Sequence, residues 1–261
     1  MVSEPIRVTV WGENVHEREE EPVRALYPDG MHAAIAAGLT ALLGERVSVR
    51  TATLDEPEHG LTDSVLAQTD VLTWWGYTAH DRVDDAVVDR VHAAVLGGVG
   101  LLALHSAHYS KIFQRLLGTS CSLRWRNDGE REYVWTVAPS HPIAQGVPHP
   151  IVIEQQEMYG EFFDIPVPDE LIFVSSFSGG EVFRSGVTFR RGHGKIFYFS
   201  PGDQDFPVYH HKDVRKVIAN GVEWAMTDLP KRAVPTLLRY ETGDFFNGHG
   251  YKRPIEEPAD A

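Results

Sequence analysis

A strand–helix–strand unit is visible in residues 71–108, which read VLTWWGYTAHDRVDDAVVDRVHAAVLGGVGLLALHSAH. The runs Val71–Trp75 and Val99–Leu104 are short and almost wholly apolar, as is typical of strands buried on both faces. Between them, apolar residues recur at helical spacing from Val83 to Val95, and a glycine cluster around Gly97 ends that helix. Two parallel strands joined by a helix are the building unit of α/β proteins.

The same alternation continues on both sides of this unit. Upstream, strands are predicted at Ile6–Trp11 and Val47–Thr53, with a helix between them whose apolar face begins at Met31. Downstream, we expect the following elements: strands at Leu171–Phe177, Val182–Arg190 and Lys195–Ser200, and a final helix with its apolar face over Val214–Ala225. The sequence therefore predicts an α/β fold with a mainly parallel sheet.

From residue 120 the pattern becomes β-rich. Ser122–Arg126 and Glu132–Val137 flank Asn127–Gly129, a turn signal that predicts a hairpin. We expect one domain over residues 1–227 with a partly inserted β-rich segment over residues 120–170. Residues 228–261 are rich in Pro, Gly and charge, and we expect an extended tail whose aromatic residues contact another subunit of a homo-oligomer.

Composition excludes several classes of function. The net charge of -13 would repel phosphate backbones, so nucleic-acid binding is not expected. The only cysteine, Cys121, permits no intramolecular disulfide, which favours the reducing cytoplasm. No run approaches the roughly 18 apolar residues of a membrane span. Because no P-loop or GxGxxG motif follows a strand, no nucleotide cofactor is expected.

Polar and aromatic side chains gather where the predicted parallel strands end, which is the edge at which ligands bind in such sheets. They are Trp11, Glu13, Asn14 and His16 after the first strand, Trp75, Tyr77 and His80 after the third, His105, Ser106 and His108 after the fourth, and Asp203, His210 and His211 after the last. Each could instead cap a helix or satisfy a turn. As a set these residues favour a ligand-binding or catalytic site at this edge of the sheet.

The segment LLALHSAH, residues 101–108, has the form of a strand that turns sharply into a helix, which is the geometry of a nucleophile elbow. Ser106 would then stand at the apex, although the flanking glycines of that motif are absent. The alternative is that Ser106 caps a helix that begins near His108. His105 and His108 are better candidates for binding than Ser106 is for attack.

The segment EQQEMYGE, residues 154–161, contains Glu157 and Glu161 four residues apart. At that spacing we expect them to share one face of a helical turn and to supply a carboxylate for a metal site or an acid–base pair; a solvated acidic turn is the alternative. Tyr159 and the aromatic residues at the strand ends would suit the apolar face of a sugar.

Five segments together resemble the trehalose-utilisation, or ThuA-like, family across Ile6–Ala225. They are TATLDEPEHGLT (51–62), DVLTWWGYTAHDRV (70–83), LLALHSAHYSKIFQRLLGTSCSLRWR (101–126), EQQEMYGEFFDIPVPDELIF (154–173) and GGEVFRSGVTFRRGHGKIFYFSPG (179–202). The resemblance implies a class I glutamine amidotransferase-like fold, which is a flavodoxin-like three-layer sandwich. It also implies a role in disaccharide or glycoside catabolism and a site that includes His80, His105, His108, Glu157 and Glu161.

Two positions depart from the pattern that the resemblance implies. The amidotransferase-like fold carries a cysteine nucleophile at the elbow, where this chain is expected to place Ser106, so glutamine hydrolysis by a thiolate is not expected. Tyr77 stands where the family pattern WWGH has a histidine.

The leading hypothesis is an enzyme that acts on a disaccharide or keto-glycoside such as 3-keto-trehalose, as a lyase, hydrolase or isomerase. His105 or His108 would be the base, and Glu157 a proton carrier or a ligand. The expected ligands of a divalent transition metal are His16, His80 and His211. The expected sugar-binding residues are Trp11, Glu13, Asn14, Trp75, Tyr77, Tyr159, Glu161 and Asp203.

Two alternatives remain open at this stage. One is a noncatalytic sugar-binding or regulatory partner of a sugar oxidoreductase. The other is a serine hydrolase in which Ser106 attacks and His211 is the base.

Overall fold

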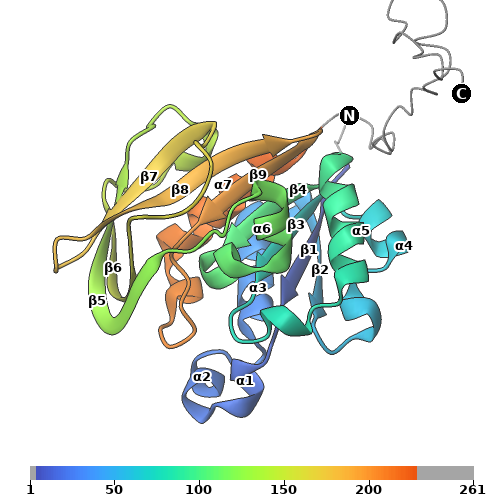
Figure 1. The fold of residues 1–261 in the computed structure, drawn as a ribbon, viewed down its shortest axis with the longest axis horizontal. Helices are drawn as coiled ribbons and strands as arrows, with labels where there is room; N and C mark the ends of the chain where they lie inside the picture. Colours follow the sequence, from blue (N-terminus) through green and yellow to red (C-terminus); the bar gives the residue numbers. More distant parts are fainter. Residues whose placement is uncertain (1–3, 228–261) are drawn as a thin grey trace, which may run out of the picture.

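The computed structural model describes residues 4–227 (Figure 1). In this part of the chain nine strands form one sheet, in the order β2-β1-β3-β4-β9-β8-β7-β5-β6. The strands are β1 (Ile6–Gly12), β2 (Val47–Thr53), β3 (Val71–Trp75), β4 (Gly100–Leu104), β5 (Arg124–Thr136), β6 (Ile151–Gly160), β7 (Glu170–Ser176), β8 (Val182–Arg191) and β9 (Gly194–Phe199). The five strands from β2 to β9 are parallel, and the other four are antiparallel. The predicted α/β fold with a mainly parallel core is confirmed.

Helices cover both faces of the parallel part of the sheet (Figure 1). They are α1 (His16–Glu19), α2 (Glu21–Leu26), α3 (Met31–Leu43), α4 (Asp63–Ala67), α5 (Asp85–Leu96), α6 (Lys111–Leu117) and α7 (Lys212–Ala225). α5 and α6 pack on one face, and α3 and α7 on the other. The result is the three-layer sandwich that the resemblance implied.

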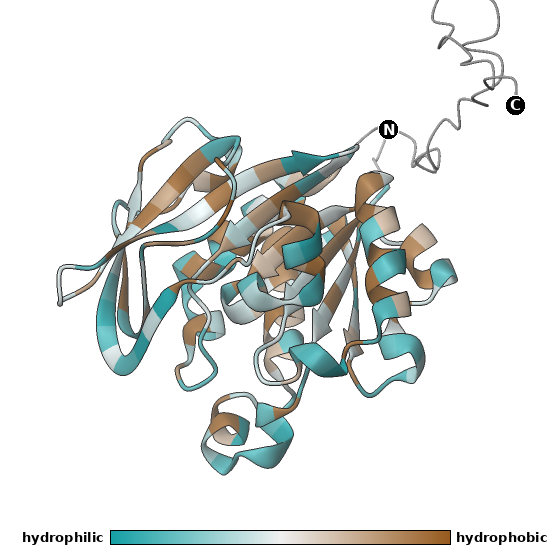
Figure 2. Cartoon of the chain, in the orientation of Figure 1, coloured by the Kyte–Doolittle hydropathy of each residue, from teal (hydrophilic) through white to brown (hydrophobic). Residues whose placement is uncertain are grey.

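Alternate residues of a central strand serve the two cores. On β4, Leu101 and Ala103 pack with α5 and α6, whereas Leu102 and Leu104 pack with α3 and α7. Both faces are therefore apolar, and Figure 2 shows hydrophobic residues concentrated in the central strands while the helices carry hydrophilic residues on their outer sides. This double burial explains why β3 and β4 read as continuous apolar runs.

The predicted hairpin at Asn127–Gly129 is wrong. Residues 124–136 form the single strand β5, which pairs antiparallel with β6. The turn-forming residues are accommodated as irregularities, because the register shifts between Arg126 and Glu130 and again before Glu132. The turn signal at Asn127–Gly129 is overridden by pairing with a strand that lies farther along the chain.

The helical turn predicted for residues 154–161 is also wrong, because residues 151–160 form β6. The antiparallel strands extend from residue 124 to residue 191, farther than the segment 120–170. The predicted tail over residues 228–261, and the subunit contact assigned to it, lie outside the described residues. No helix in residues 4–227 is long and apolar enough to span a membrane.

Candidate functional site

The sharp turn after β4 has His105 at its apex. His105 has φ +50°, in the left-handed region that residues other than glycine rarely adopt, and residues 105–109 continue as one turn of 3-10 helix. The prediction that Ser106 occupies the apex is therefore wrong. Ser106 is not a helix cap either, because α6 begins at Lys111 and its capping oxygen is Oγ of Ser110.

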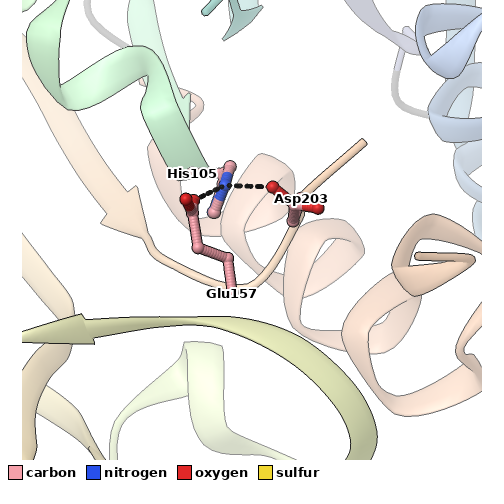
Figure 3. Close-up of side chains that lie close together, drawn as sticks. All are labelled: His105, Glu157 and Asp203. Atoms are coloured by element: carbon pink, nitrogen blue, oxygen red, sulfur yellow. Dashed lines mark ion pairs between the residues drawn. The ribbon is translucent and has the colours of Figure 1, made fainter. Parts of the chain in front are cut away.

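Three buried side chains meet at this apex (Figure 3). Nε2 of His105 lies 3.0 Å from a carboxylate oxygen of Glu157 and 3.5 Å from one of Asp203. His105 follows β4, Glu157 belongs to β6, and Asp203 lies in the loop after β9. All three are almost fully buried, with exposed fractions of 0%, 4% and 1%. Segments up to about a hundred residues apart in the chain thus converge on one imidazole.

The orientation of the imidazole is set by its other nitrogen. Nδ1–H of His105 donates to the carbonyl oxygen of Ser200 at 2.6 Å, which leaves Nε2 facing the two carboxylates. Tyr159 stacks on the ring, with centroids 4.6 Å apart, and its hydroxyl lies 3.2 Å from Nε2. Burial disfavours the charged ring, but hydrogen bonds to Asp203 and Glu157 outweigh it and raise the pKa of His105 to about 10.

The same three residues form a fitting set of metal ligands. One ligand atom from each of His105, Glu157 and Asp203 lies within 4.8 Å of the others. One imidazole nitrogen and two carboxylate oxygens suit a divalent transition metal, and a ligating histidine commonly donates its second N–H to a carbonyl, as His105 does to Ser200. The metal centre that the sequence placed on His16, His80 and His211 does not form: no group of three ligands within residues 4–227 contains them.

A cavity of about 210 Å³ opens beside this group. Its wall consists of Tyr77, His80, Ser106, His108, Tyr109, Ser122, Leu123, Trp125, Glu157 and Tyr159. Glu157 is the only one of the three clustered residues in that wall. His105 and Asp203 therefore stand behind it.

Two further histidines in the wall are neutral at physiological pH. Burial lowers the pKa of His80 to about 4 and that of His108 to about 3. Nδ1–H of His108 donates to the carbonyl oxygen of Cys121 at 2.7 Å, so its Nε2 is left as an acceptor. Burial also raises the pKa of the Cys121 thiol to about 11, so its thiolate form is disfavoured at neutral pH.

Ser106 also belongs to the wall, and its buried hydroxyl has no hydrogen-bond partner among the described residues. The side chain is 2% exposed. A buried hydroxyl without a partner costs about 1–3 kcal/mol, so a ligand oxygen in the cavity would offset an existing penalty.

The family model for ThuA, trehalose utilisation, matches residues 7–225. The chain belongs to the ThuA family. A ThuA-like protein from Bacteroides uniformis has 13% identity and a TM-score of 0.62, with 86% of this chain and 93% of that chain covered. A ThuA-like protein from Parabacteroides merdae has 17% identity and a TM-score of 0.60, with 89% and 94% covered. PurLQS from Thermotoga maritima has 13% identity and a TM-score of 0.51, with 85% and 99% covered, in keeping with an amidotransferase-like fold. No curated protein matches the sequence.

Three residues that the sequence assigned to sugar binding instead build the scaffold of this ThuA-family site. The carboxylate of Glu13 accepts the backbone N–H groups of residues 77–79 at 2.8–3.1 Å and so anchors the loop that carries Tyr77 and His80. Trp11 is a core residue, stacked on Trp74 with centroids 4.0 Å apart. Trp75 is fully buried, and its indole N–H donates to the carbonyl oxygen of Gly202, beside Asp203.

Other predicted residues lie away from the ThuA cavity or have different partners. Glu161 forms an ion pair with Arg184 at 2.8 Å. His16 contacts Glu20 at 2.6 Å, and Asn14 contributes its backbone carbonyl to Arg18. Both ring nitrogens of His211 are engaged, because Nδ1 caps α7 and Nε2 donates to the carbonyl oxygen of Val152. His211 therefore does not serve Ser106 as a base, which removes the serine-hydrolase hypothesis.

The sequence did not single out Trp125 or Ser122, which both line the cavity. Trp125 lies opposite Tyr159 in the pairing of β5 with β6. A correct prediction of that register would have identified it. Neither strand was predicted with its observed bounds.

Proposed function

We propose that this ThuA-family chain is an enzyme that removes the proton beside the ketone of a 3-keto-glycoside, with Glu157 as the base. The observation that carries the proposal is that Glu157 lies in the cavity wall while its carboxylate contacts the buried, oriented ring of His105. The family's link to trehalose utilisation supports a disaccharide as the substrate, and 3-keto-trehalose is the keto form that the proposed proton removal requires.

The assignment of the base differs from both candidates that the sequence suggested. His105 does not line the cavity, and its two nitrogens face Ser200 and the carboxylates. His108 lines the cavity, but its pKa of about 3 makes it a weak base at neutral pH. Glu157 is the ionisable group that combines access to the cavity with a charged partner behind it, and His105 is its positioning residue.

The proposed reaction needs no oxidant. A ketone at C3 acidifies the C2–H bond; Glu157 takes that proton, and the electron pair of the bond forms an enolate. The enolate then expels the oxygen substituent from C1, so that a C1=C2 double bond forms and the C1–O bond breaks. The C3 ketone is restored, and the leaving oxygen takes up the proton held by Glu157 and departs as an alcohol, which returns Glu157 to its carboxylate form. Return of the proton to C2 instead would give an isomer.

Charge develops on the C3 oxygen during this step, and a donor aimed at that oxygen would lower the barrier. The unpartnered hydroxyl of Ser106 is the donor that we assign to it. The neutral rings of His80 and His108 would accept hydrogen bonds from sugar hydroxyls. His105, Glu157 and Asp203 would hold a divalent metal that supplies a Lewis acid when bound; a Glu157 carboxylate that ligates it would no longer be free as the base, so the transfer of the C2 proton to Glu157 belongs to the metal-free site.

The substrate implies a functional partner. A C3 ketone arises only if a C3 hydroxyl has been oxidised, so an oxidoreductase acting on the sugar must supply it. We propose such an enzyme as the preceding partner of this chain.

The test is an assay of the purified protein on 3-keto-trehalose and on trehalose, with chelator and with added Zn²⁺, Mn²⁺ or Mg²⁺. We expect consumption of the keto sugar alone, and a loss of about 10² to 10⁴-fold in kcat for Glu157→Gln. The matched control is Glu154→Gln, an exposed residue of the same strand paired with Arg131, which should keep full activity.

Absence of turnover with every metal would reject the reaction. Calorimetry then decides whether the chain is instead the noncatalytic sugar-binding partner, which would bind a disaccharide without consuming it.

A further inference from the structure

Exposed aromatic side chains are concentrated at the mouth of the cavity. Three of the five exposed aromatic residues in residues 4–227 line it, namely Tyr77 at 37% exposed, Tyr109 at 53% and Trp125 at 60%. The other two are Trp135 and Phe162. A cluster of exposed aromatic residues around a cavity that also holds a few polar groups is characteristic of a binding surface.

The position of Trp125 follows from strand register. Trp125 on β5 lies opposite Tyr159 on β6, so both side chains project from the same face of the sheet. Tyr159 is buried against His105, whereas Trp125 remains exposed. The two rings thus lead from the buried imidazole to the outer rim of the cavity.

The size of the cavity limits what it can enclose. Its volume of about 210 Å³ lies below the range of roughly 300 to 1,000 Å³ for pockets that enclose a drug-sized ligand. A single sugar ring is therefore the appropriate occupant. When a disaccharide places one ring beside Glu157, the second ring must lie at the mouth, where the exposed aromatic residues are.

We propose that Trp125, with Tyr109 and Tyr77, forms a second sugar subsite that stacks on the C–H face of the ring attached at C1 of the reacting sugar. The identity of the reacting ring rests on the proposed function. A flat aromatic side chain buries the apolar face of a sugar ring and leaves the hydroxyl edge in water. The subsite selects disaccharides over glycosides with a small substituent at C1.

The kinetic test compares 3-keto-trehalose with the methyl glycoside of the same 3-keto sugar. We expect Trp125→Ala to reduce the ratio of the two kcat/KM values about tenfold, through KM for the disaccharide, and Trp125→Phe to retain most of the ratio. Trp135→Ala is the matched control, because Trp135 is an exposed tryptophan of the same strand outside the cavity wall. An unchanged ratio in Trp125→Ala, or an equal loss in Trp135→Ala, would overturn the subsite.

An equilibrium measurement separates this inference from the proposed reaction. Calorimetry with trehalose and methyl α-glucoside should show tighter binding of the disaccharide, with that advantage lost in Trp125→Ala and kept in Trp135→Ala. If this holds while no keto sugar is consumed, the subsite stands and the reaction fails. If keto sugars are consumed but the disaccharide has no Trp125-dependent advantage, the reaction stands and the subsite fails.

Discussion

Replacing Glu132 with glutamine should make the protein more stable above neutral pH. Glu132 is 1% exposed; one carboxylate oxygen accepts the hydroxyl of Ser175, and the other has no partner among the described residues. Burial raises its pKa from 4.5 to about 7, against the smaller opposing effects of the Ser175 hydrogen bond and the charge of His105.

The direction of the effect follows from the raised pKa. The folded protein holds the Glu132 proton more tightly than the unfolded chain does. The stability that this protonation contributes is complete below pH 4.5 and is lost as the pH rises to about 7. At about 1.36 kcal/mol per pKa unit, the total loss is about 3 kcal/mol, most of it between pH 5 and pH 8. The side chain introduced by Glu132→Gln has no titrating proton, so that variant would not show this loss.

The assay is equilibrium urea denaturation from about pH 5 to about pH 8, for the wild type, Glu132→Gln and the exposed control Glu154→Gln. Because the wild type and Glu132→Gln share every other titrating group, the difference between their curves isolates residue 132, and Glu154→Gln shows the effect of removing an exposed carboxylate. We expect the difference in free energy of unfolding between Glu132→Gln and the wild type to shift by about 2–3 kcal/mol in favour of the variant as the pH rises from about 5 to about 8. Parallel curves for the wild type and Glu132→Gln would refute a buried, uncompensated carboxyl group.

Two predictions concern the scaffold and the metal centre. Glu13→Ala leaves the N–H groups of residues 77–79 without their acceptor, so it should lower the free energy of unfolding by about 2–4 kcal/mol and raise KM for the keto sugar. Denaturation and steady-state kinetics measure the two effects, and an unchanged KM would mean that the loop does not depend on this anchor. For the metal centre, each protein is loaded with Zn²⁺ or Mn²⁺, desalted and submitted to elemental analysis. Asp203→Asn should contain at least about tenfold less metal than the wild type or the control variant Asp205→Asn. Equal metal contents would exclude a metal centre at His105.

The parallel half of the fold could be predicted because its signals are local. Strands buried on both faces must be apolar throughout, and Val71–Trp75 and Gly100–Leu104 satisfy that demand without reference to any partner. The antiparallel half could not be predicted as well. Asn127–Gly129 carries a good turn sequence, but it lies within β5 because residues of β6 some 26 to 36 positions away pair across it.

The candidate site was predicted only in part for a similar reason. His105 and Asp203 were among the candidates because residues at the ends of parallel strands meet at one edge, whereas Glu157 was a candidate through the carboxylates of residues 154–161 and the family resemblance. His211 and Glu13 occupy equivalent places in the pattern, yet His211 caps α7 and Glu13 holds the loop at residues 77–79. A side chain's role depends on which donors and acceptors the fold brings within hydrogen-bonding distance, and these partners come from distant segments.

The order of apolar runs and helical faces by itself determined the α/β class, the parallel core and the edge at which polar residues collect, since burial and backbone hydrogen bonding act on each segment separately. Only the tertiary structure decided that His105 rather than Ser106 stands at the apex, that Glu157 alone of the clustered acids reaches the cavity, and that Trp125 faces its mouth. Those outcomes depend on a backbone dihedral at one turn and on the register of two strands, and both are set by packing between parts of the chain that are far apart in sequence.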